Sequence, residues 1–134
     1  MIKRSRERIK KWMDKYIPKG VGVIYDVDNK LLSKLIVSRN AIKTALSMAH
    51  DNHILRDTAL RRLGKIINKA EYIGWAEDEI LPNGKQKHPD VSYWLYYKTK
   101  YGIINVRRMK DGTDRFYCID MDENPNIKKG DPIR

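Results

Sequence analysis

The residues best suited to acid-base chemistry are two histidines three positions apart, His50 and His53. An imidazole takes up and releases protons near neutral pH, so either ring is suited to act as a general base. Two histidines at this spacing can also bind a metal ion, but their acidic neighbours are only Asp51 and Asp57, and the cationic surroundings oppose a divalent ion. The alternative for both is an ordinary surface position, which is also the interpretation for His88 in a predicted loop.

RNA cleavage without a metal needs only residue types that this chain contains. It requires a group that takes the proton of the 2′-hydroxyl, a group that protonates the leaving oxygen, and cations that stabilise the charged phosphorane. His50 or His53 supplies the base, the lysines and arginines supply the cations, and tyrosine or threonine hydroxyls complete the set. The sequence has no Walker A loop, no GxSxG, no paired-carboxylate motif and no dinucleotide fingerprint, so other enzyme classes have less support.

Four large aromatic side chains occur in the predicted strand 92–99. Because side chains alternate along a strand, Tyr93 and Tyr97 share one face, while Trp94 and Tyr96 share the other. A strand with one solvent-exposed face rarely needs so many rings. Trp94 and Tyr96 are therefore candidates for stacking on nucleobases. The alternative is that helices cover one face and a loop covers the other.

Asp111-Gly112 predicts a tight hairpin between two strands that end and begin near it. A two-residue turn places Arg108 opposite Arg115, a like-charge pair that needs a carboxylate or a phosphate between its members. Asp111 or Asp114 would provide the carboxylate. One face of this hairpin is predicted to pack in the core, and the other face carries a mixture of charged, amide and aromatic side chains. The predicted core face is Ile104, Val106, Tyr117 and Ile119, and the mixed face is Asn105, Arg107, Phe116 and Cys118.

The positive charge of the chain is confined to its first half. The 134 residues include 28 Lys and Arg against 17 Asp and Glu, a net charge of +11. Residues 1–70 hold 17 basic and 6 acidic side chains, whereas residues 71–134 hold 11 of each. A concentrated excess attracts a polyanion, so RNA, tRNA included, is the predicted partner. The predicted nucleic-acid-binding residues are Arg39, Arg61, Arg62, Lys65, Arg108, Arg115, Trp94 and Tyr96.

Other readings of this charge are solvated helix faces, an acidic lipid surface, or an acidic protein such as an immunity protein or antitoxin. The single cysteine, Cys118, excludes an internal disulfide, and no Cys/His cluster is present to hold zinc, so a reducing, cytoplasmic compartment is expected. No apolar run approaches the roughly 20 residues that span a bilayer, and no signal peptide is recognisable. We expect no cofactor, no membrane association and one domain. Oligomeric state is not predicted.

Hydrophobic periodicity predicts an α+β protein, with N-terminal helices packed on a small antiparallel sheet of about four strands. The predicted helices are 2–16, a helix capped by Ser38, and a helix from about 54 to 72 that ends before Gly74. The predicted extended segments are 21–27, 31–37, 91–99, 103–109 and 115–121. Residues 1–20 are interpreted as a basic amphipathic arm, 21–122 as the domain, and 123–134 as a loose polar tail.

Several patterns follow one another along about 35–121. They are SRNAIKTALSMAH, NKAEYIG, HPDVSYWLYYKT, GIINVRRMKDG and RFYCID. Together they resemble nuclease domains of the barnase–EndoU–colicin–RelE superfamily, most closely the versions appended to phage head-associated and large polyvalent mobile-element proteins. The resemblance implies helices packed on an antiparallel sheet of about four strands. It also implies a metal-independent, toxin-like ribonuclease that is delivered by, or released from, a larger phage or mobile-element protein.

The resemblance further implies where the active site lies. In several relatives a Ser-His pair ends the first conserved helix, whereas this sequence has Ser47-Met48, so the histidine is either displaced to His50 or His53 or missing. The remaining implied site residues are Lys43, Lys98, Thr99 and Arg107 or Arg108. The implied reaction leaves a 2′,3′-cyclic phosphate on the RNA.

Overall fold

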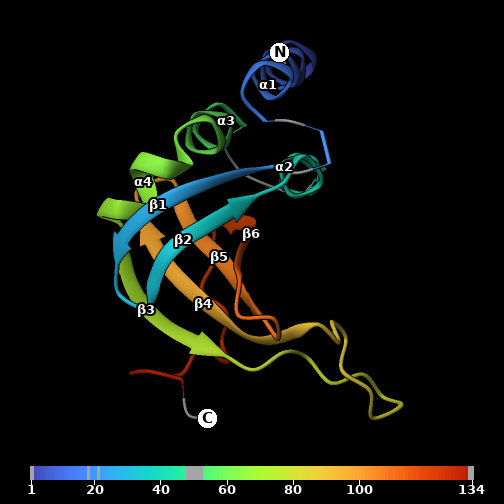
Figure 1. Ribbon diagram of the computed structural model, residues 1–134, viewed down its shortest axis with the longest axis vertical. Helices are drawn as coiled ribbons and strands as arrows, with labels where there is room; N and C mark the ends of the chain where they lie inside the picture. Colours follow the sequence, from blue (N-terminus) through green and yellow to red (C-terminus); the bar gives the residue numbers. More distant parts are fainter. Residues whose placement is uncertain (1, 18, 21, 48–52, 133–134) are drawn as a thin grey trace.

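The structure is a computed structural model that describes residues 2–17, 19–20, 22–47 and 53–132. These residues form four helices and a six-stranded sheet (Figure 1). The helices are α1 (Ile2–Tyr16), α2 (Arg39–Ser47), α3 (His53–Arg61) and α4 (Leu63–Lys69). The strands are β1 (Val23–Asn29), β2 (Leu32–Val37), β3 (Glu71–Ala76), β4 (Val91–Thr99), β5 (Gly102–Met109) and β6 (Asp114–Asp120).

The sheet has the strand order β1-β2-β6-β5-β4-β3. Neighbouring strands are antiparallel except β2 and β6, which are parallel and meet at Ile36 and Arg115. The N-terminal hairpin β1–β2 thus extends the sheet that the later strands form. The predicted α+β class is confirmed, but the sheet is larger than about four strands, and it is mixed rather than antiparallel.

Strand β3 begins where the sequence predicted a helix. That helix is interrupted at Arg62 and ends at Lys69, because Ala70 has extended backbone with φ −73° and ψ 149°. The chain then pairs with β4, and Gly74 takes a φ of 144°, a conformation that favours glycine. Pairing buries Trp75 to 4 % exposure, so tertiary packing overrides the local helical pattern.

The main core lies between the helices and one face of the sheet. Figure 1 shows the helices gathered on one side of the sheet, with α1 farthest from the strands. Ile9, Met13 and Ile17 are buried in this core, so the basic N-terminal helix packs on the rest of the domain. At the start of α2, the Ser38 hydroxyl accepts a hydrogen bond from the Ala41 N–H at 3.1 Å, as an N-cap does.

The opposite side of the sheet, here called the open face, carries a second and smaller apolar cluster. Its buried members are Ala76, Val91, Trp94, Tyr96 and Ile103. The segment after β6 reaches this side, where Lys128 exchanges two backbone hydrogen bonds with Trp75, at 2.7 and 3.0 Å. Residues 77–90 form a long loop that extends beyond the end of β3 and returns to the start of β4 (Figure 1). No helix among the described residues is long and apolar enough to cross a membrane.

Candidate functional site

A cleft of about 660 Å³ lies on the open face, between the projecting loop and the segment that follows β6. The loop contributes His88 and Asp78, and β4 contributes Trp94 and Tyr96. The other lining residues are Glu77, Glu79, Ile80, Lys87, Asn105, Tyr117, Asn124, Asn126 and Lys128. The cleft therefore gathers titratable, aromatic and amide side chains from five separate parts of the chain.

The centre of the cleft is a histidine held by a buried carboxylate. His88 Nδ1 lies 2.9 Å from Asp78 Oδ1, and the His88 backbone N–H donates to Asp78 Oδ2 at 2.6 Å. The Trp94 indole Nε1–H also donates to Asp78 Oδ1, at 3.0 Å. A carboxylate that accepts from Nδ1 fixes the tautomer of the imidazole and leaves Nε2 available to react. In the described part of the chain, Nε2 has no hydrogen-bond partner.

Asp78 is held in its charged form. Burial raises its pKa, but the hydrogen bonds from His88 and Trp94 lower it by more, so the pKa lies below the ordinary aspartate value. The carboxylate side chain is 3 % exposed, whereas the His88 side chain is 28 % exposed. The buried partner is thus a fixed anion, and the imidazole is the partner that faces solvent.

Two ion pairs balance the two glutamates that flank Asp78. Glu79 pairs with Lys87 at 3.2 Å, and Glu77 pairs with Lys128 at 3.6 Å. All four side chains are more than half exposed, so each pair is held weakly. The acidic run at 77–79 therefore does not leave the cleft strongly negative.

Aromatic rings surround the His88 imidazole. Its ring centroid lies 5.5 Å from that of Trp94 and 6.1 Å from that of Tyr117, in edge-to-face geometry. Trp94 and Tyr117 contact each other at 5.0 Å. The Arg107 guanidinium lies over the Tyr117 ring at 5.5 Å, which brings a permanent cation to the margin of the cleft.

Tyr117 reaches the open face because of a bulge in the β5–β6 ladder. The predicted pairs 104 with 119 and 105 with 118 are confirmed, but the register then shifts, so that Val106 pairs with Phe116. The prediction that Tyr117 faces the core and Phe116 the open face is therefore wrong. Phe116 is 1 % exposed in the main core, and Tyr117 packs on the open-face cluster. A bulge adds one residue to one strand and reverses the alternation beyond it.

The bulge also changes the predicted pairing of the arginines. Arg108 lies opposite Asp114, and Arg115 lies opposite Arg107 on the open face. The Arg108 guanidinium binds both carboxylate oxygens of Asp114, the Tyr93 hydroxyl and the Leu31 carbonyl. Four of its five N–H donors are thus used within the protein, which leaves little of the guanidinium for the predicted nucleic-acid contact. The like-charge pair on the open face is Arg107 with Arg115.

Two buried polar atoms on the open face of β5 lack a hydrogen-bond partner among the described residues. They are Asn105 Oδ1 and Arg107 Nε. The Asn105 amide nitrogen donates to Asp120 at 2.8 Å, which fixes the orientation of its oxygen. A buried unpaired polar atom costs roughly 1–3 kcal/mol, so such atoms are typical of sites that bind a ligand or a water.

The two histidines predicted as the general base lie at or beyond the limits of the residues that the structure describes. His50 falls outside the described residues, as does Met48. His53 is the first residue of α3, and its side chain is not described. The structure therefore does not test whether His50 or His53 is a general base. It does place His88, which was predicted to be a surface residue, in a cleft beside a buried carboxylate.

The other predicted residues are distributed over several surfaces. Trp94 and Tyr96 line the cleft with His88 but are only 7 % and 4 % exposed, so the structure leaves them little surface on which a base could stack. Arg107 lies at the margin of the cleft. Lys98 is exposed at the end of β4. Lys43 and Arg39 line another cleft, beside α1 and α2.

The remaining cations and Thr99 lie near α4. Thr99, Arg62 and Lys65 line a groove there, and Arg61 is exposed at the end of α3. The predicted site is thus divided into three places, and among the described residues only the open face holds a histidine paired with a carboxylate.

The sequence does contain an indication of this site. Asp78 lies ten residues before His88 in one loop, and long loops in compact domains are often functional. The sequence around His88 has no helical or strand periodicity, so it does not predict which side chain lies beside the imidazole. The pairing of β3 with β4 is what brings the two ends of the loop, and with them Asp78 and His88, together. The described residues contain no group of three or more His, Cys, Asp or Glu that could hold a metal ion. Comparison with protein-family models, with curated proteins and with solved structures gives no match to the chain.

Proposed function

We propose that the protein is a metal-independent ribonuclease whose general base is His88. The observation that carries the proposal is the His88–Asp78 pair at 2.9 Å, set in a cleft that is also lined by aromatic rings. Asp78 orients the imidazole, as a buried carboxylate does in other histidine-dependent enzymes. An imidazole oriented this way is suited to remove the proton of a 2′-hydroxyl.

Arg107 and the rings complete the reaction. The proton of the 2′-hydroxyl passes to His88 Nε2, the 2′-oxygen attacks phosphorus, and the bond from phosphorus to the 5′-oxygen breaks. Arg107 stabilises the charge that develops on the phosphoryl oxygens, which is the role that guanidinium groups serve in phosphoryl chemistry. The Tyr117 hydroxyl protonates the leaving 5′-oxygen, and the product strand ends in a 2′,3′-cyclic phosphate. The half-buried Tyr117 ring supplies a face on which a neighbouring base stacks, whereas Trp94 is only 7 % exposed and packs against the His88 ring instead.

The chain has three histidines, so the same substitution at the other two provides a matched control for the substitution of His88. Purified wild type and the variants His88→Gln, His53→Gln and His50→Gln are incubated with RNA in EDTA, and the 2′,3′-cyclic end is identified by mass spectrometry. We expect His88→Gln to lower the rate about 10²- to 10⁴-fold, the usual contribution of general acid-base catalysis. The other two variants should retain the wild-type rate. Loss of cleavage in His50→Gln or His53→Gln, with activity kept in His88→Gln, would move the active site to the helices.

A second candidate is a nucleic-acid-binding module without catalysis. The distribution of charge favours it, because the lysines and arginines gather around α2 and α4, whereas the acids and bases of the His88 cleft are nearly balanced. It predicts that RNA is bound and never cleaved, with an affinity that His88→Gln leaves unchanged. The product analysis in EDTA therefore separates the two candidates.

A further inference from the structure

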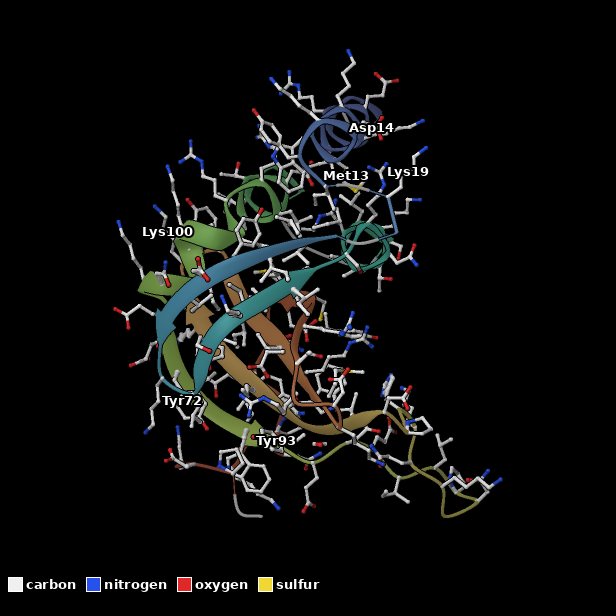
Figure 2. All side chains as sticks on the ribbon, viewed as in Figure 1. Met13, Asp14, Lys19, Tyr72, Tyr93 and Lys100 are labelled. Carbon is white, nitrogen blue, oxygen red and sulfur yellow. The ribbon has the colours of Figure 1, made fainter. Side chains whose placement is uncertain are left out.

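A groove of about 480 Å³ lies between α4 and the turn that joins β4 to β5. Its walls are Ile66 and Tyr101, and its cations are Arg62, Lys65, Lys69 and Lys100. The first three cations project from or just before α4, and Lys100 comes from the turn. Figure 2 shows Lys100 beside α4, on the helix-covered side of the molecule.

The groove is lined by four cations and no acid. None of these four side chains forms an ion pair with an acidic residue of the described chain. Elsewhere in the described chain basic side chains are often neutralised, as Arg39 is by Asp14 at 2.5 Å. Unpaired cations on two sides of a concave surface create a positive potential that draws a chain of phosphates into it.

The turn that supplies Lys100 is fixed in shape. The Thr99 hydroxyl donates to the Gly102 carbonyl at 2.7 Å and accepts from the Tyr101 N–H at 3.0 Å. The Lys100 ammonium lies 5.2 Å from the centroid of the Tyr101 ring. The lysine is therefore held at the rim of the groove, so less side-chain freedom is lost when a phosphate binds.

From these observations we infer that the groove is a binding site for the phosphate backbone of single-stranded RNA, separate from the His88 cleft. The inference rests on the proposed function in taking RNA as the ligand. The groove begins at the C-terminal end of β4, about 17 Å along the strand from Trp94 at a rise of roughly 3.3 Å per residue. A strand of RNA held in the groove is thereby anchored at a distance from the cleavage site.

RNA fits this groove better than an acidic membrane does. Surfaces that bind membranes present large apolar side chains for insertion beside their cations. The exposed large apolar residues of the described chain are Tyr16, Ile24, Leu55, Ile80 and Met121, and none of them lines the groove. The groove is also concave, which suits a chain of phosphates rather than a flat bilayer.

The test measures binding without cleavage. A labelled RNA of about 16 nucleotides, the upper end of site sizes for small single-strand-binding folds, carries 2′-O-methyl groups so that it cannot be cut. Its affinity is measured at several salt concentrations for wild type, for Lys65→Gln/Lys69→Gln and for the control Lys110→Gln/Lys129→Gln. Both double variants remove two exposed lysines, but the control lysines line none of the clefts described above.

We expect the groove variant to lower the slope of log affinity against log salt by about 1.4, because each phosphate contact to a single strand contributes roughly 0.7. The control should change the slope little. Equal slopes for the two variants, with both folded by circular dichroism, would overturn the inference. Binding to vesicles of acidic phospholipid that is lost in the groove variant, without any effect on RNA, would overturn it in favour of a lipid site.

A dinucleotide substrate separates this inference from the proposed function. It is too short to reach the groove, so the groove variant should cleave it at the wild-type rate. If no RNA is ever cleaved but the slope falls as expected, the groove stands and the proposed ribonuclease fails. If RNA is cleaved and the two double variants have equal slopes, the groove fails and the ribonuclease stands.

Discussion

Replacing Asp78 with alanine tests whether the carboxylate holds the open-face cleft together. The Trp94 indole N–H would lose its acceptor in a residue that is only 7 % exposed. A buried donor left without a partner costs roughly 1–3 kcal/mol. The His88 backbone N–H would lose its bond as well, but it can be partly rehydrated because the His88 side chain is 28 % exposed. We expect a total loss of about 3 kcal/mol in the free energy of unfolding.

Glu79 provides the matched control, one residue away in the same loop. Its ion pair with Lys87 joins side chains that are 65 % and 51 % exposed, and such a pair is worth roughly 0–1 kcal/mol. Urea unfolding of Asp78→Ala, Glu79→Ala and wild type gives the three values. The urea concentration at the midpoint of unfolding should fall strongly for Asp78→Ala alone. The slope of the unfolding free energy against urea concentration should stay the same in all three proteins. Equal losses for the two variants would refute the buried hydrogen-bond network.

The same pair of variants has a defined response to pH. Because the folded state lowers the pKa of Asp78, the carboxylate stabilises the fold above the unfolded pKa of about 3.9. That stabilisation disappears as the pH falls through the lower folded value. The stability difference between wild type and Asp78→Ala should therefore be largest near neutral pH and shrink below about pH 4. A difference that grows in acid would contradict the charged form of Asp78.

Three further predictions concern other parts of the molecule. Burial, aided by Asp131 and Tyr93, raises the pKa of Tyr72 to about 12. The free energy of unfolding, measured with urea, should therefore fall as the pH rises from about 10 to about 12. It should fall less in the variant Tyr72→Phe, which has no hydroxyl to ionise. Gly74→Ala would place a Cβ 2.4 Å from the Lys128 carbonyl oxygen, so trypsin should cleave the C-terminal segment faster than in wild type; equal cleavage would contradict the docking of that segment. Burial raises the pKa of the Cys118 thiol, so iodoacetamide should label it only after unfolding, and rapid labelling of the native protein would contradict this.

The elements with strong local patterns could be predicted from the sequence. The basic amphipathic helix, the helix capped by Ser38 and the three C-terminal strands occur where periodicity and turn residues predicted them. Strand β3 could not be predicted, because its residues continue a helical pattern and become a strand only by pairing with β4. The parallel contact of β2 with β6 joins residues almost eighty positions apart, and no local pattern indicates such a pairing.

The candidate site was predictable in its residue types and not in its geometry. Alternation along the strand alone predicts that Trp94 and Tyr96 lie on one face of the sheet and Tyr93 and Tyr97 on the other, and the structure confirms this. The bulge in β6 has no signature in the sequence, so the exchange of Phe116 and Tyr117 between the faces could not be foreseen. The pairing of His88 with a carboxylate ten positions earlier depends on how the loop folds back on itself.

The place of β6 in the sheet has a consequence for synthesis on the ribosome. This last strand lies between β2 and β5, so the N-terminal hairpin has no route into the rest of the sheet until residues 114–120 have emerged. Chains emerge from the N-terminus at roughly 5–20 residues per second, and long-range pairing of this kind forms late. Until then the half that carries the excess positive charge can form its own local contacts, such as the β1–β2 hairpin and the hydrogen bonds from Asn29 to the end of α4, but it cannot join the remaining strands.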